Sequence, residues 1–173
     1  MSSLSQDIDA ILRTVPDFPK PGIQFKDITP LFTKPELLGR VIDDFAAQFS
    51  EGVDAIVGVE SRGFLFGVPL ALNLGIPFVL ARKVGKLPAE KISYTYDLEY
   101  GTATLEMHTD AISKGQKVVV IDDLLATGGT ARATANLVEQ LGGEVISFAF
   151  VIELSFLNGA QTLSAPTYSL LTY

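Results

Sequence analysis

The segment Val118–Ala131 reads VVVIDDLLATGGTA and places two adjacent acids between an apolar run and a glycine-containing turn. Its first four residues are mostly β-branched and predict a buried strand, which Asp122 and Asp123 would close. The small residues Ala126–Thr130 predict a turn, and Ala131–Leu141 is compatible with a helix. A helix start directs unpaired backbone N–H groups and a positive dipole end outwards. The segment therefore predicts a phosphate-binding site.

The two acids indicate what else the ligand carries. A carboxylate in direct contact with phosphate would repel it, so Asp122 and Asp123 are expected to accept hydrogen bonds from sugar hydroxyls, which indicates a ribose 5-phosphate. An ATP-hydrolysing P-loop is not predicted, because Arg132 stands in place of its Gly-Lys-Ser/Thr. A structural interpretation stays open, in which the acids only end a strand and the glycines only form a tight turn.

The composition of the chain is that of a globular protein. Of its 173 residues, 47% are hydrophobic and 19% charged, which suits one domain, 1–173, with its own core. We expect a cytoplasmic protein without a membrane partner, because the sequence has neither an apolar run of roughly 18 residues nor a signal peptide. The absence of cysteine excludes disulfides, a thiol nucleophile and thiolate metal ligands. A net charge of −7 argues against nucleic-acid binding.

The N-terminal part of the chain contains two predicted helices and a loop. Apolar residues at helical spacing predict a helix over Leu4–Val15, which Pro16 would end. Three prolines and a glycine predict a stiff loop without regular structure over Phe18–Pro30. A second apolar stripe, behind Pro35, predicts a helix that covers the body of the protein.

A strand, a helix and a second strand are predicted over Ala55–Val59, Phe64–Leu74 and Phe78–Ala81. Their short connections indicate a right-handed parallel βαβ unit, and ligands bind at the carboxyl ends of such strands. Both strands are followed by basic loops, SRG at 61–63 and RKVGK at 82–86, whose cationic groups suit phosphate. By itself the second loop could be a solvated surface run, but its place at a strand end favours an anion site.

The remaining elements complete a sheet. Alternating residues over Ile92–Leu98 and Thr102–Met107 predict a hairpin with Glu99 at its tip, where an acid could equally be an ordinary exposed turn residue. Three more strands are predicted towards the C-terminus: Val145–Ile152, Thr162–Pro166 and Tyr168–Leu171. About four parallel core strands, a hairpin and a tail would form an α/β fold, a doubly wound and mainly parallel sheet flanked by helices.

The stretch VVVIDDLLATGGT at 118–130 resembles the phosphoribosyl-pyrophosphate signature of the type I phosphoribosyltransferases. Its LLATGGT version is similar to the members of this family that act on adenine, and the resemblance runs from Phe18 to Tyr173. It implies the fold of that family, with a small hood over 1–34, made of the N-terminal helix and a base-covering loop, and a flexible hairpin lid over 87–107. It also implies that the peptide bond Glu60-Ser61 can be cis.

The resemblance assigns a role to each motif. Asp122, Asp123 and Glu99 would be catalytic, with Glu99 handling the proton on the purine. The implied binding residues are Ala126, Thr127, Gly128, Gly129 and Thr130 for the 5-phosphate, Ser61, Arg62, Arg82, Lys83 and Lys86 for pyrophosphate, and Gln24, Phe25, Lys26 and Leu124 for adenine. At Lys26 the family usually has arginine, whose planar fork lysine lacks.

The activity implied is transfer of the 5-phosphoribosyl group from 5-phosphoribosyl-1-pyrophosphate to adenine, giving AMP and pyrophosphate. A magnesium ion (Mg2+) would be held mainly by substrate and water, with no direct protein ligand. A homodimer is implied as well. Two alternatives stay open: the same chemistry on another purine, and a non-catalytic nucleotide-sensing module on the same fold. The basic loops and the acid at the hairpin tip argue against the second.

Overall fold

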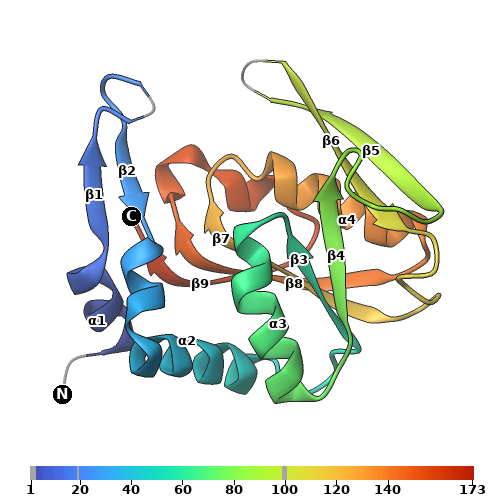
Figure 1. The fold of residues 1–173 in the computed structure, drawn as a ribbon, viewed down its shortest axis with the longest axis horizontal. Helices are drawn as coiled ribbons and strands as arrows, with labels where there is room; N and C mark the ends of the chain where they lie inside the picture. The colour runs from blue at the N-terminus through green and yellow to red at the C-terminus, as the bar shows by residue number, and fades with distance from the viewer. Residues whose placement is uncertain (1–2, 19, 99–100) are drawn as a thin grey trace.

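The computed structural model describes residues 3–18, 20–98 and 101–173, which form a seven-stranded sheet, a two-stranded hairpin and four α-helices (Figure 1). No helix in these ranges is long and apolar enough to cross a membrane. The helices are α1 (Leu4–Ile11), α2 (Pro35–Gln48), α3 (Arg62–Leu74) and α4 (Gly129–Gln140), and the 3-10 helices are η1 (Thr29–Thr33), η2 (Ser155–Leu157) and η3 (Gly159–Thr162). The strands are β1 (Arg13–Pro16), β2 (Gln24–Asp27), β3 (Ala55–Val59), β4 (Phe78–Lys83), β5 (Lys91–Asp97), β6 (Thr102–His108), β7 (Lys117–Leu125), β8 (Glu144–Glu153) and β9 (Thr167–Thr172).

The central part of the sheet is parallel. In the order β5-β6-β4-β3-β7-β8-β9, the strands from β4 to β9 are parallel, and β6 joins β4 antiparallel. The chain leaves β3 through α3 towards one edge and leaves β7 through α4 towards the other. The predicted doubly wound, mainly parallel α/β fold is confirmed, with five parallel core strands where about four were predicted.

Helices cover both faces of the sheet because strand residues alternate between two apolar clusters. On one face Ile56 and Val119 pack in a cluster with residues of α1, α2 and α3. On the other face Val57 and Val120 pack in a cluster with residues of α4. Burial on both faces explains why β3 and the first half of β7 read as continuous apolar runs in the sequence.

The N-terminal segment differs from its prediction. The helix α1 ends at Ile11 instead of Val15, and β1 then pairs antiparallel with β2, which lies in the segment predicted as an irregular loop. The Arg13 guanidinium lies 3.4 Å from the Asp27 carboxylate across this pair. The helix was predicted too long because the apolar spacing continues beyond Ile11. The β1–β2 pair was not predicted because pairing between two segments does not change the local periodicity of either.

Two boundaries around the acid pair also differ. β7 does not stop at the acids but continues to Leu125, because β8 pairs with it over that length. The helix α4 begins at Gly129, before the predicted start at Ala131. The turn is therefore shorter than predicted, and the acids lie within a strand instead of after it.

One predicted strand is wrong. The segment Thr162–Pro166 does not form a strand: Thr162 ends η3, and β9 begins only at Thr167. The Thr162 hydroxyl donates to the carbonyl oxygen of Gly159 at 2.8 Å, a local bond that favours a turn. The other predicted helices and strands are confirmed, with ends that shift by a few residues.

Two hairpins, β1–β2 and β5–β6, lie on either side of the ends of β3 and β7 (Figure 1). β1–β2 stands near the C-terminal end, and Lys26 Nζ lies 4.2 Å from the centre of the Tyr173 ring. β5–β6 forms one edge of the seven-stranded sheet, and β9 forms the other edge. In this view the ends of β3 and β7 lie between the two hairpins.

A close approach between α3 and β7 depends on Gly63. A Cβ atom at this position would lie 2.5 Å from the carbonyl oxygen of Ile121 and 3.3 Å from Asp122 Cα. No side chain could avoid this contact, because the nearest atom belongs to the backbone of a central strand. Glycine at this position therefore brings the start of α3, with Arg62, against the acid end of β7.

Substitution of Gly63 by alanine tests this close approach. Gly63→Ala should lower the free energy of unfolding by about 1–3 kcal/mol, because the methyl group collides with backbone. The matched control is Gly39→Ala in the exposed part of α2, where a Cβ meets nothing within 4 Å. This control should raise stability by up to about 1 kcal/mol, since alanine favours helix. Equal effects in urea denaturation would contradict the prediction.

Candidate active site

A cavity of about 340 Å³ opens where the chain diverges to both sides of the sheet, at the ends of β3 and β7. Open α/β sheets bind ligands at this switch point. Its lining contains most of the residues that the sequence singled out for the acid pair, the turn and the first basic loop. Lining residues are Glu60, Ser61, Arg62, Lys83, Tyr96, Leu105, Asp122, Asp123, Leu124, Leu125, Ala126, Thr127, Gly128, Gly129, Thr130, Ala131 and Phe150.

The turn Ala126–Thr130 runs directly into α4. Gly128 caps the helix with φ +81°, a left-handed conformation that glycine adopts without strain. Within the helix, the first acceptor–donor pair joins Gly128 O to the N–H of Arg132 at 2.9 Å. The N–H groups before Arg132 have no acceptor inside the helix and border the cavity, so they can bind an anion.

The turn is in close contact with η3, a segment distant in the sequence. Gly159 of η3 packs so closely that a Cβ on it would lie 2.1 Å from the carbonyl oxygen of Ala126. A Cβ on Gly128 would lie 2.5 Å from the Thr162 hydroxyl. The shape of the phosphate turn therefore depends on residues that the sequence motif does not contain.

Asp122 and Asp123 stand side by side at the cavity wall. The Asp123 residue is only 6% exposed, and its backbone N–H donates to Asp122 Oδ1 at 2.9 Å. Burial, with the Asp123 carboxylate beside it, raises the pKa of Asp122 well above its ordinary value. The pair is thus placed to accept hydrogen bonds from a sugar, at an electrostatic cost that a positively charged ligand group would reduce.

Arg62 partly offsets this cost. Its Nε donates to Asp123 Oδ2 in an ion pair between the start of α3 and the end of β7. Partial burial by itself would lower the pKa of Arg62, but the Asp123 and Asp122 carboxylates raise it. Half of the Arg62 side chain stays exposed, so the guanidinium borders the cavity while it is paired.

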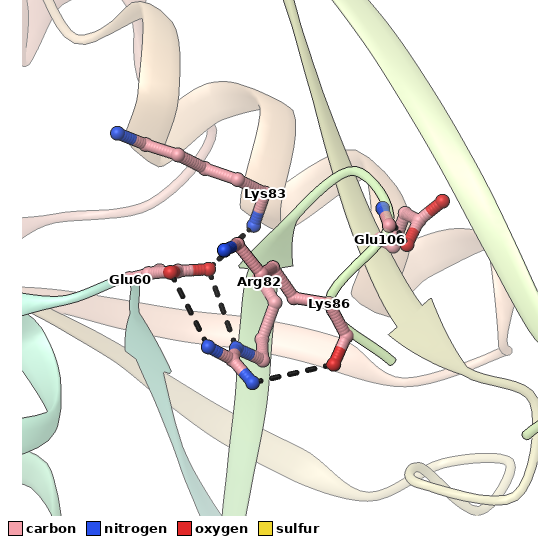
Figure 2. A network of polar contacts seen from close by, with 6 residues as sticks. Glu60, Arg82, Lys83, Lys86 and Glu106 are labelled. Atoms are coloured by element: carbon pink, nitrogen blue, oxygen red, sulfur yellow. Dashed lines mark hydrogen bonds and ion pairs between the residues drawn. The ribbon is translucent and has the colours of Figure 1, made fainter. Parts of the chain in front are cut away.

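The second basic loop is organised by an acid (Figure 2). Both oxygens of the Glu60 carboxylate accept from the Arg82 guanidinium, each at 3.3 Å, and Oε2 also accepts the backbone N–H of Lys83 at 2.8 Å. Burial opposes ionisation of Glu60, but these hydrogen bonds and the cations lower its pKa below the ordinary value. Arg82 Nη1 donates to the carbonyl oxygen of Lys86 at 3.3 Å.

Lys83 is oriented differently from its neighbours. Figure 2 shows its side chain extending away from the Glu60–Arg82 pair, and Lys83 lines the cavity. Among the described residues, the cavity lining does not include Arg82 or Lys86. The cationic cluster predicted at 82–86 is therefore divided between Lys83, which lines the cavity, and Arg82 and Lys86, which lie outside its described lining.

Two acids of this region were missed by the sequence reasoning. Glu60 follows β3 directly, and Glu106 on β6 is only 4% exposed and accepts the Gly85 N–H at 3.0 Å. The available signal for Glu60 was its place next to Ser61-Arg62 at a strand end, whereas no local pattern marks Glu106. The peptide bond between Glu60 and Ser61 is cis, as the resemblance allowed.

The residues predicted for the base lie in two places. Leu124 lines the cavity, whereas Gln24, Phe25 and Lys26 lie on β2 outside its described lining. Phe25 packs edge-on against Phe18, with ring centres 5.2 Å apart. Lys26 Nζ donates to Thr14 Oγ1 at 3.2 Å, in addition to its contact with Tyr173.

Glu99 lies outside the described residues. Its predicted role in proton transfer therefore stays a prediction from the sequence. The strand β5 that precedes it is described as far as Asp97, and Tyr96 on that strand reaches the cavity although no role was predicted for it.

Comparison with known families agrees with this geometry. Residues 32–166 match the family model described as the phosphoribosyl transferase domain, and the chain belongs to this family. An adenine phosphoribosyltransferase of Myxococcus xanthus is 56% identical over 163 residues, which is 94% of this chain and 89% of that protein.

Two solved structures are similar over nearly the whole chain. Adenine phosphoribosyltransferase from Saccharomyces cerevisiae, complexed with D-2,5-dideoxy-2,5-imino-altritol 1,6-bisphosphate and adenine, has a TM-score of 0.94 and 44% identity, covering 98% of this chain and 99% of that one. The enzyme from Trypanosoma brucei, in complex with AMP, pyrophosphate and ribose-5-phosphate, has a TM-score of 0.89 and 28% identity, covering 99% and 80%.

The buried acid Asp122 gives a pH-dependent prediction. Since its pKa is raised in the folded state, ionising it destabilises the fold as the pH rises from its ordinary value of 3.8 through the raised one. Asp122→Asn keeps an oxygen acceptor but carries no charge. The variant should therefore be more stable than the unsubstituted chain at pH 8, and the difference should shrink towards pH 4.

Urea denaturation across this pH range measures the effect. The control is Asp110→Asn, a change of the same type at an exposed position, which should produce no such trend. A stability difference for Asp122→Asn that is constant with pH would contradict the prediction.

Proposed function

We propose that this chain transfers the 5-phosphoribosyl group from 5-phosphoribosyl-1-pyrophosphate to adenine, forming AMP and pyrophosphate. The proposal rests on the combination of groups that line one cavity: a helix start for the 5-phosphate, two acids for the ribose, and Arg62 and Lys83 for the diphosphate. The named relatives, of which one is solved with adenine and another with AMP and pyrophosphate, support the choice of substrates.

The reaction needs no covalent nucleophile. The bond from ribose C1 to the diphosphate oxygen breaks, and both electrons leave with the diphosphate. A nitrogen of adenine bonds to C1 and then loses its proton to the Glu99 carboxylate, the acceptor that the sequence predicts. Arg62 and Lys83 would stabilise the charge that builds on the leaving oxygens. Asp122 and Asp123 would hold the ribose hydroxyls and favour positive charge on the ring. The turn at 126–130 fixes the 5-phosphate and thereby the position of C1.

The donor set near the cavity suits magnesium bound through the substrate. Among the described residues, no three His, Cys, Asp or Glu side chains converge as a metal site. Magnesium retains several waters and often binds through substrate phosphates, so an ion held by the diphosphate, with Asp122 and Asp123 nearby, fits these residues. When bound, it would neutralise part of the diphosphate charge.

The two hairpins supply the remaining parts of the proposal. β1–β2, with Phe25, would cover the base, since an aromatic ring offers a large stacking surface at little entropic cost. The segment 87–107, which contains β5 and all of β6 except His108, would act as the lid that excludes water. We place the reaction in the cytoplasm, because a substrate with several phosphate charges does not cross a lipid bilayer unaided.

A base panel tests the substrate. With 5-phosphoribosyl-1-pyrophosphate and magnesium, adenine should release pyrophosphate at least about 100-fold faster than hypoxanthine or guanine, since buried polar groups reject a wrongly paired edge. Chelation of the metal with EDTA should abolish release, and excess magnesium should restore it. Preference for another purine would support the second candidate reaction. Binding without turnover for every base would indicate a sensing module.

The helix α3 carries the surface proposed for a homodimer. Leu65, Val68 and Leu72 are 49%, 42% and 77% exposed and follow one another at helical spacing. Exposed apolar side chains grouped on one helix face are typical of a protein–protein contact. A second copy of this chain is the proposed partner.

A charge on this face, at its most exposed residue, tests the dimer. Leu72→Glu should convert a dimer into a monomer at micromolar concentration, because the carboxylate would have to be buried unpaired. Leu157→Glu, at a 40% exposed leucine in η2, is the control and should stay dimeric. Size-exclusion chromatography with light scattering measures the mass. A monomeric unsubstituted chain would refute the proposal.

A further inference from the structure

Tyr96 connects the β5–β6 hairpin to the phosphate turn. Its hydroxyl oxygen lies 3.0 Å from Thr130 Oγ1, and Tyr96 lines the same cavity as the turn. Its ring lies against the start of α4, since a Cβ on Gly129 would be 3.7 Å from Tyr96 Cδ2. The tyrosine therefore contacts two consecutive residues of the turn, one through its ring and one through its hydroxyl.

The Thr130 hydroxyl has one hydrogen to donate. In the protein without ligand, either oxygen of the Tyr96–Thr130 pair can be the donor. A phosphate dianion offers only acceptors, so Thr130 can bond to it only by donating its hydrogen. Thr130 then has to receive its second hydrogen bond from Tyr96, and the two bonds polarise each other.

We propose that Tyr96 is a positioning residue of the 5-phosphate subsite, which donates to Thr130 Oγ1 and directs the Thr130 hydrogen at the bound phosphate. The inference rests on the proposed function, because it requires a ligand with a 5-phosphate. It assigns to the hairpin a role in phosphate binding that differs from covering the site. The sequence motif at 118–130 does not contain this residue.

Removal of the Tyr96 hydroxyl isolates its effect on phosphate binding. Tyr96→Phe keeps the ring packed on Gly129 and removes only the donor. Tyr94→Phe is the matched control, because Tyr94 is two positions earlier on β5, packs on the same apolar cluster, and has no hydroxyl bond among the described residues. The ligands are AMP and adenosine, which differ only by the 5-phosphate.

Calorimetric titration of both ligands gives the result. Tyr96→Phe should weaken AMP binding about 3- to 10-fold, the range for one hydrogen bond that is assisted by charge, and leave adenosine binding unchanged. Tyr94→Phe should change neither. In a Thr130→Val background, Tyr96→Phe should have no further effect on AMP, because the hydroxyl it serves is gone.

The outcomes separate the inference from the function on which it rests. If the unsubstituted chain does not prefer AMP to adenosine, the 5-phosphate site and the proposed function both fail. If it prefers AMP but Tyr96→Phe binds AMP equally well, the role of Tyr96 alone is refuted. Equal loss of AMP and adenosine in Tyr96→Phe would also refute it, since the tyrosine would then support the whole site.

Discussion

The difference in length between two neighbouring strands makes this site possible. β3 ends at Val59, and its last pair with β7 joins Gly58 to Ile121. β7 continues to Leu125, and over this end β8 is its only strand neighbour among the described residues. The end of β7 therefore borders open space where β3 has turned away into α3. Asp122 and Asp123 occupy this end, and the approach of α3 at Gly63 places Arg62 directly opposite them.

Charges around the cavity are paired across elements before any ligand arrives. Arg62 on α3 binds Asp123 on β7, and Glu60 holds both the Arg82 side chain and the backbone of Lys83. Such pairs fix the side chains in position, which reduces the entropy that binding would otherwise cost. The anionic groups of a phosphorylated sugar would then meet cationic side chains that the Asp123 and Glu60 carboxylates already hold in position.

Support for the phosphate turn comes from parts of the chain that are far from it in sequence. Gly159 and Thr162 of η3 pack behind the turn, and Tyr96 of β5 contacts its helical side. Because these groups contact different residues of the turn, a change in its shape would disturb the C-terminal segment or the hairpin. The conformation of a short glycine motif is thus determined by the surrounding tertiary contacts.

The amino-acid sequence alone determined the α/β class, most strands and helices, and the association of an acid pair with a phosphate turn. These features depend on apolar periodicity and turn chemistry, which are properties of consecutive residues. Only the tertiary structure decided the β1–β2 pairing, the length of β7 beyond Asp123 and the absence of a strand at 162–166. It also decided the pairing of Glu60 with Arg82, and the contact of Tyr96 with Thr130. The extension of β7 along β8 and the Glu60–Arg82 and Tyr96–Thr130 contacts join residues distant in the chain, so their energies depend on which segments the fold brings together.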